Sequence, residues 1–206
     1  MQVKEPTFDF SGGEPCLDFA NTVGGRGRDQ PREGLGGYAE LVSWGEQAGL
    51  VTGSEKRRLL QEAADRQAEA ATVLKRATGL REAIYRAFSA LVNGRSTRPA
   101  DLATLNAELS MALARLRLVP GPDGLGWDWA ADDRALDGVI WSVAHSAAEL
   151  LTSERLDRVR ECAESRCGWL FLDASRNRSR QWCDMKVCGN RAKARRHHAR
   201  KKATAR

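Results

Sequence analysis

Apolar side chains recur at helical spacing along most of the first 150 residues. Leu41, Val42 and Trp44 lie on one side of a helix predicted over residues 38–48, with Gly49 at its C-terminal end. Three further stripes with steps of three and four residues predict later helices, and they comprise Leu80, Ile84, Phe88 and Leu91, then Leu102, Leu105, Leu109, Ala112 and Leu116, and then Leu136, Ile140, Val143, Ala144, Ala147, Leu150 and Leu151. We interpret these stripes as the core of an α-rich domain.

Local signals place several helix ends. Thr52 followed by Glu55 has the pattern of a capping box, which predicts a helix from there to about Ala77. The dipeptide Asn93-Gly94 is expected to end the next helix, and Pro99 to begin another.

The last apolar stripe predicts a helix that connects two parts of the chain. Asp132 and Asp133 suit its start, because carboxylates complement the positive end of a helix dipole. We expect this helix to continue through Arg155 to Cys162, so that it forms a rigid connection to the C-terminal segment.

Alternation with period two predicts a small β component. Residues 116–119 and 125–129 alternate on either side of a Pro- and Gly-rich cluster, which is typical of a β-hairpin. Residues 8–10 predict a further short strand. Trp127 and Trp129 share one face of the hairpin, where they either line an apolar effector pocket or cover neighbouring helices.

Polar groups near the N-terminus have two readings. Residues 15–23 predict a short helix with Asp18 and Asn21 on its polar side, where they either face a ligand or hydrogen-bond the local backbone. Residues 24–37 contain six glycines but no phosphate-loop ending. We interpret that segment as a flexible surface loop, whose three arginines offer at most a minor anion contact.

Four of the five cysteines form two pairs near the C-terminus. Four residues separate Cys162 from Cys167 and Cys183 from Cys188, and fifteen residues lie between the pairs. Four thiolates can hold one structural zinc ion in a tetrahedron, and each close pair supplies two ligands. The alternative is two disulfides or four unrelated thiols, and a reducing cytosol disfavours disulfides.

The residues around the pairs predict a small zinc module. Residues 168–172 are an apolar, aromatic run typical of a strand, residues 173–178 have turn chemistry, and residues 179–182 are expected to return as a second strand. Residues 190–202, rich in Ala, Arg and Lys, predict a helix. The order of knuckle, hairpin, knuckle and helix is treble-clef-like.

Positive charge is concentrated in this module. From Cys162 to the C-terminus, 13 Lys and Arg face 3 Asp and Glu, which gives a net charge of +10. The whole chain carries +6, so the preceding residues sum to −4. Because Lys and Arg bind phosphates with release of counterions, this asymmetry favours a polyanionic partner.

The run Cys188-Gly189-Asn190-Arg191, preceded by Ser175-Arg176-Asn177 and Trp182-Cys183, resembles the CGNR zinc-finger family. Residues 17–22, LDFANT, are similar to the start of the ABATE domain, which precedes the zinc module in that family. The resemblance covers nearly the whole chain. It implies a stress-induced bacterial transcription regulator, in which the zinc module binds DNA and the front domain senses an effector.

The predicted fold is therefore mainly α (α+β), with an ABATE-like domain over residues 1–154 and a treble-clef-like zinc module over residues 155–206. We expect a cytoplasmic DNA-binding regulator, associated with the nucleoid when bound to DNA, without a membrane partner. An unknown small-molecule effector and a homodimer are further expectations. The predicted nucleic-acid contacts are Arg176, Asn177, Arg178, Arg180, Lys186, Asn190, Arg191, Lys193, Arg195 and Arg196. Asn190 and Arg191 have a rival role in bracing the zinc site.

Other classes of function stay open. An RNA-binding protein would use the basic surface and exposed aromatic rings to bind single strands. A protein–protein adaptor would use the zinc module only to dock a partner. We do not expect an enzyme, because four thiolates leave zinc no open position and the sequence has none of the common catalytic motifs.

Overall fold

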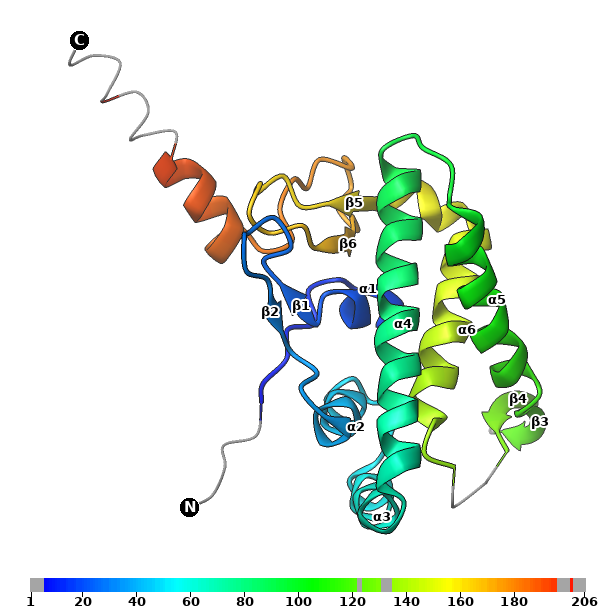
Figure 1. Cartoon of the computed structure of the whole chain (residues 1–206). Helices are drawn as coiled ribbons and strands as arrows, with labels where there is room; N and C mark the ends of the chain where they lie inside the picture. The colour runs from blue at the N-terminus through cyan, green and yellow to red at the C-terminus, as the bar shows by residue number, and fades with distance from the viewer. Residues whose placement is uncertain (1–5, 122–123, 131–134, 196–200, 202–206) are drawn as a thin grey trace.

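A long central helix organises the computed structural model (Figure 1), which describes residues 6–121, 124–130, 135–195 and 201. Helices α5 and α6 lie beside helix α4, helix α1 packs on α4 and α6, and α2 and α3 lie toward one end of α4. The bounds of the helices are α1 Pro15–Ala20, α2 Tyr38–Gln47, α3 Gly53–Asp65, α4 Gln67–Val92, α5 Pro99–Leu113 and α6 Gly138–Thr152.

Three two-stranded antiparallel sheets accompany the helices. Strands β1 (Val23–Gly24) and β2 (Arg32–Glu33) pair within the glycine-rich segment. Strands β3 (Leu116–Gly121) and β4 (Gly124–Trp129) form the predicted hairpin, with Leu118 opposite Trp127. Strands β5 (Val159–Glu161) and β6 (Leu170–Leu172) belong to the C-terminal module.

Several predicted helix ends are confirmed. The Thr52 hydroxyl accepts a hydrogen bond from the Glu55 N–H, and the Glu55 carboxylate accepts one from the Thr52 N–H, so the capping box is complete. Pro99 begins α5, and Gly49 follows α2 with a φ of 73°, a conformation that favours glycine.

The predicted helix from Thr52 to Ala77 is wrong in one respect, because the chain breaks at Arg66. Arg66 has φ −124° and ψ 48°, outside the helical region. Its guanidinium binds Glu62 in α3 and Glu69 in α4, which secures the bend. The break allows α3 to pack on α2 while α4 packs against the rest of the bundle.

The buried face of α5 is also displaced from the predicted apolar stripe. Leu102 is exposed, whereas Asp101 and Glu108 are buried. Asp101 binds Arg86 and Arg98, and Glu108 binds Arg76 in α4. These ion pairs satisfy carboxylates that burial alone would penalise.

The connection to the zinc module differs from the predicted continuous helix. Helix α6 ends at Thr152, and a short 3-10 helix, η1 (Glu154–Arg158), leads into β5. The Ser153 hydroxyl accepts a hydrogen bond from the Arg155 N–H and starts this new turn. Val159 then extends as a strand and is buried in the helical core.

Two predicted strands are absent from their positions. Residues 8–10 are irregular, and residues 179–182 form no strand. The partner of β6 is β5, because the apolar Val159 can pack in the core, whereas the guanidinium of Arg180 is used to bind carbonyl groups. Among the described residues, none of the helices is long and apolar enough to cross a membrane.

Candidate metal centre and basic surface

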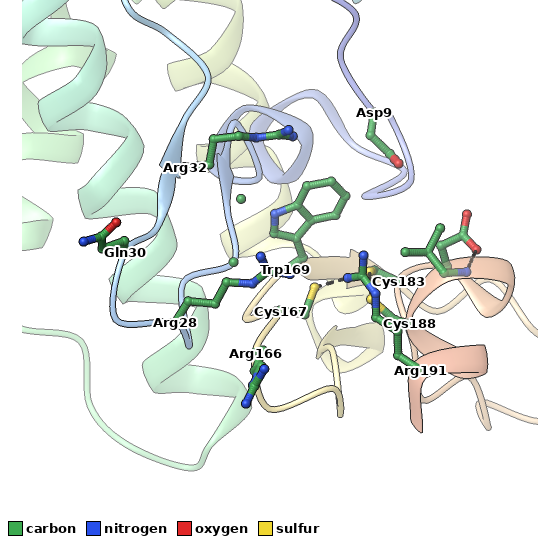
Figure 2. Close-up of a pocket in the computed structure, with 14 residues that line it drawn as sticks. Asp9, Arg28, Gln30, Arg32, Arg166, Cys167, Trp169, Cys183, Cys188 and Arg191 are labelled. Carbon is green, nitrogen blue, oxygen red and sulfur yellow. Dashed lines mark hydrogen bonds between the residues drawn. The ribbon is translucent and has the colours of Figure 1, made fainter. Parts of the chain in front are cut away.

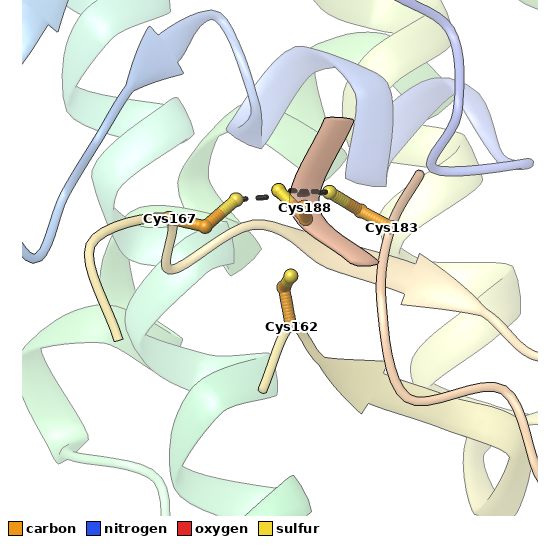
Figure 3. A group of neighbouring side chains, drawn as sticks. All are labelled: Cys162, Cys167, Cys183 and Cys188. Carbon is orange, nitrogen blue, oxygen red and sulfur yellow. Dashed lines mark hydrogen bonds between the residues drawn. The ribbon is translucent and has the colours of Figure 1, made fainter. Parts of the chain in front are cut away.

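The four paired cysteines converge in the C-terminal module (Figure 3). Their sulfur atoms all lie within 4.8 Å of one another, and the Sγ–Sγ distances Cys167–Cys183 and Cys183–Cys188 are both 3.6 Å. Tetrahedral zinc with bonds of about 2.3 Å to sulfur requires sulfur–sulfur distances of about 3.8 Å. All four side chains are buried, and none forms a disulfide. The arrangement therefore fits one zinc ion rather than two disulfides.

A tight turn between β5 and β6 presents the first pair. The Cys162 N–H donates to the Trp169 carbonyl over 2.8 Å, and the Cys167 N–H donates to the Glu164 carbonyl over 2.8 Å. Gly168 follows with a φ of 69°, which most side chains disfavour. Local backbone chemistry thus positions two thiolates on one knuckle.

A wide helical turn presents Cys188, the second cysteine of the second pair. Residues Met185–Gly189, labelled η2, form one π-helical turn, and residues 190–195 continue as α-helix, so the helix begins earlier than predicted. The Asp184 side chain accepts a hydrogen bond from the Val187 N–H over 2.9 Å, and its carbonyl accepts one from Cys188 over 2.9 Å. Asp184 therefore caps the turn that carries Cys188.

The electrostatics of the cluster favour a cation. Hydrogen bonds with Cys167 and Cys183 lower the pKa of Cys162. Backbone N–H groups of Cys183 and Glu164 also lower the pKa of Cys162. Four buried thiolates need a compensating charge, and a zinc ion supplies it while leaving no open coordination position for catalysis.

The fifth cysteine has a different environment. Cys16 lies in α1 within the helical core and is fully buried. Burial raises the pKa of its thiol to about 12, so it stays protonated at neutral pH.

The zinc module is fixed to the front domain at several points. Asn21, at the end of α1, donates to the Leu170 carbonyl over 2.8 Å and accepts from the Leu170 N–H over 2.9 Å. The Trp169 indole N–H donates to the Val23 carbonyl over 2.9 Å. The Arg26 N–H donates to the Cys167 carbonyl over 3.0 Å. The module therefore shares contacts and part of its core with the helices.

Asp18 and Asn21, for which the sequence left a ligand role open, both make structural hydrogen bonds. Asp18 is 6% exposed and accepts from the Gly12 N–H over 2.7 Å. Both residues also line a cavity beside Trp169. The side-chain amide of Asn21 is hydrogen-bonded there to the backbone N–H and carbonyl of Leu170. Asn21 is therefore part of the joint between the two parts of the chain, whereas the Asp18 hydrogen bond lies within the front domain.

The two hairpin tryptophans lie in different environments. Trp127 is 66% exposed. Trp129 packs against Trp141 and makes an edge contact with His145. Trp129 thus covers helix α6, which was one of the two roles considered for it.

The described residues among the predicted nucleic-acid contacts are four cations without a partner, two asparagines, and three arginines that bind other parts of the chain. Four exposed cations make no side-chain hydrogen bond or ion pair within the described residues, and they are Arg176, Lys186, Arg191 and Lys193. Asn177 is also exposed, and the amide of Asn190 donates to the Lys186 carbonyl. Arg196 lies outside the described residues, as do Asp132 and Asp133.

Three of the predicted contacts, Arg178, Arg180 and Arg195, bind other groups of the same chain. Arg178 binds Asp157, and Arg195 binds both carboxylate oxygens of the buried Glu164. Arg180 donates to the carbonyls of Ser11, Trp182 and Cys183 and lies 4.5 Å above the Phe171 ring. Arg180 therefore braces the zinc module.

The glycine-rich segment is the part of the site that sequence reasoning missed. Arg26 binds both carboxylate oxygens of Glu82 over 2.7 and 3.0 Å and stacks on Tyr85. A Cβ atom at Gly27 would overlap the Ser165 carbonyl. The segment is therefore packed against the first knuckle and is not a free surface loop. The cluster of six glycines in fourteen residues was the available signal, since glycine also permits close backbone approach.

A helical domain with an appended four-cysteine module defines a zinc-finger protein. Residues 13–154 match the ABATE family, described as "Putative stress-induced transcription regulator", and residues 158–201 match the CGNR zinc finger. The chain belongs to the ABATE family and carries a CGNR zinc finger at its C-terminal end. Neither is an enzyme family. A comparison with curated proteins gives no match.

Proposed function

We propose that the protein is a cytoplasmic, zinc-dependent transcription regulator that binds duplex DNA through its C-terminal module. The observation that carries this proposal is a set of exposed cations on the zinc module that have no side-chain partner among the residues that the structure describes: Arg176, Lys186, Arg191 and Lys193. Zinc-bound cysteines lie between or beside these positions and hold them on one scaffold. Such groups contact phosphates, and the exposed Asn177 is available to read a base edge.

The test is DNA affinity as a function of salt. Genome-wide selection with the zinc-loaded protein identifies a bound duplex, and fluorescence anisotropy then measures its affinity from about 50 to 200 mM salt. Four phosphate contacts give a log–log slope of about −3.6, or about a hundredfold loss of affinity across this range. Lys193→Gln should reduce the slope by about one unit. Arg95→Gln, which changes an exposed arginine after α4, is the matched control.

The same assay distinguishes the other functions. Preferential binding of single-stranded RNA in direct competition would identify an RNA-binding protein. A flat salt dependence with weak affinity for every nucleic acid would favour a protein–protein adaptor and overturn the proposal. Sedimentation at increasing concentration tests the accompanying proposal of a homodimer, which a palindromic site would suit.

We also propose effector control through the front domain. The contacts of Asn21 and Trp169 couple the helices to the zinc module, so a ligand that changes this joint would reorient the basic surface. The proposal requires a ligand with different affinities for the DNA-bound and free states.

A further inference from the structure

A cavity of about 300 Å³ lies where the glycine-rich segment meets the zinc module (Figure 2). Its walls come from residues 24–32, the first cysteine knuckle and the turn that carries Cys188. Small-ligand sites in proteins begin at about this volume. The cavity is therefore large enough for one ring with a charged substituent.

Four arginines from separate segments line this cavity: Arg28, Arg32, Arg166 and Arg191. All four are exposed, and none makes a side-chain hydrogen bond or ion pair within the part of the chain that the structure describes. In Figure 2, Arg28 extends toward Trp169 and Arg191 extends toward the cysteines on the opposite side of the view, so that the two side chains approach each other, while Arg166 points away. Asp9 and Asp184 also line the cavity, as do Cys167, Cys183 and Cys188 of the metal site. Four thiolates around one zinc ion carry a net charge of −2, so the cavity as a whole is near neutral, and the guanidinium groups of Arg28 and Arg191 are the cations that an anion contacts there.

The segment that carries Arg28 and Arg32 is held in place by other side chains. Arg26 is bound by Glu82, and Glu33 accepts two hydrogen bonds from the buried Arg81 over 2.6 and 2.7 Å. Anchors on both sides leave Arg28 and Arg32 available to a ligand. A site whose backbone is fixed in advance loses less entropy on binding.

Trp169 supplies a planar apolar wall. Its indole N–H is already bound to the Val23 carbonyl, which fixes the ring beside the arginines. A fixed aromatic face favours stacking with a ligand ring. The four thiolates saturate the zinc ion, so the ligand binds the arginines and not the metal.

We propose that this cavity binds a small organic phosphate in which a phosphate monoester is attached to a ring. The phosphate lies between Arg28 and Arg191, since guanidinium groups bind phosphate oxygens in pairs, and the ring lies on Trp169. The ligand bridges the glycine-rich segment of the front domain and the helix of the zinc module. Binding itself does not depend on the proposed DNA function.

Calorimetric titration of the zinc-loaded full chain tests the proposal, with phenyl phosphate as the probe. We expect binding of phenyl phosphate, weaker binding of inorganic phosphate, and no binding of phenol. Arg28→Gln and Arg191→Gln should each weaken phenyl phosphate at least tenfold, whereas Arg95→Gln should leave its affinity unchanged. Zinc content and circular dichroism verify that each variant is folded.

Two results would overturn the proposal. One is equal affinity of all variants for phenyl phosphate. The other is a wild-type protein that does not bind phenyl phosphate at millimolar concentration. If phenyl phosphate fails to bind but Arg28→Gln weakens DNA, the arginines serve the DNA backbone and the small-ligand proposal is wrong. Because the titration contains no DNA, loss of the proposed DNA function leaves its result unaffected.

Discussion

The side-chain amide of Asn21 forms both of its direct hydrogen bonds with the peptide groups of Leu170, 149 positions away in the chain. One bond is donated to the Leu170 carbonyl and the other is accepted from its N–H. Both residues are buried. A single side chain in the front domain thus acts as an additional partner for strand β6 of the zinc module.

Replacing this amide should destabilise the whole protein. Asn21→Ala leaves two buried backbone groups without partners, at a cost of about 1–3 kcal/mol for each unsatisfied group. We expect the free energy of unfolding in urea, measured on the zinc-loaded protein, to fall by about 2–6 kcal/mol. Asn177→Ala, which alters an exposed asparagine, is the control. A loss of less than about 0.5 kcal/mol, the range of neutral surface changes, would contradict this role.

Gly27 should not tolerate a side chain. A methyl group there overlaps the Ser165 carbonyl, so Gly27→Ala must push the glycine-rich segment away from the first knuckle. Overpacking of this kind costs about 1–3 kcal/mol. Thermal unfolding measures the loss, and Gly36→Ala, where nothing lies near the new Cβ, is the matched control. Equal stability of the two variants would disprove the close approach.

Asp18 should make stability depend on pH. Burial raises the pKa of its carboxyl from 3.8 to about 7, despite a hydrogen bond from the Gly12 N–H and with help from the charge of Asp9. Between these values the folded state holds a proton that the unfolded state releases, so stability falls as pH rises, by at most about 1.4 kcal/mol per pH unit.

Asp18→Asn removes this titration and keeps an oxygen that can accept the Gly12 hydrogen bond. The stability of the variant relative to wild type should therefore increase between about pH 4 and pH 7 and level off above that. Chemical denaturation at a series of pH values measures the difference, in which effects of pH on the metal site cancel. A difference that does not change with pH would show that Asp18 does not titrate in this range.

Substitutions at Arg180 and Lys193 should affect stability differently, because Arg180 braces the fold and Lys193 is a proposed DNA contact. Arg180→Gln removes hydrogen bonds to three carbonyl groups and the contact with Phe171, so we expect a loss of about 1–3 kcal/mol in unfolding free energy. Lys193→Gln should change stability by less than about 0.5 kcal/mol. The two variants are compared by urea unfolding at saturating zinc. The opposite order would mean that Arg180 is not a brace.

Removal of the metal should destabilise the helical domain as well as the zinc module. Chelation leaves four thiols that require protons, and Val159 and Leu170 carry the disturbance into the helical core. We expect one zinc ion per chain by mass spectrometry and a lower unfolding temperature after chelation. Cys183→Ser should lose the metal, whereas Cys16→Ala should retain it. Retention of zinc by Cys183→Ser would show that another residue completes the site.

The sequence by itself determined the features that depend on near neighbours. The cysteine spacing predicted the zinc site, because each pair spans a single turn of backbone. The pattern from Thr52 to Glu55 predicted a helix start, and the Gly- and Pro-rich cluster after Val119 predicted a hairpin. Within each cysteine pair, at the helix start and at the hairpin turn, the groups that carry the signal lie within a few residues of one another, so composition and spacing were sufficient.

Tertiary structure decided which polar groups are already occupied. Nothing near Arg180 or Arg195 in the sequence distinguishes them from Lys193, yet Arg180 reaches Ser11 and Arg195 reaches Glu164. The break at Arg66 likewise depends on what each helix packs against. These outcomes rest on partners distant in the chain, and only folding brings such partners within hydrogen-bonding distance.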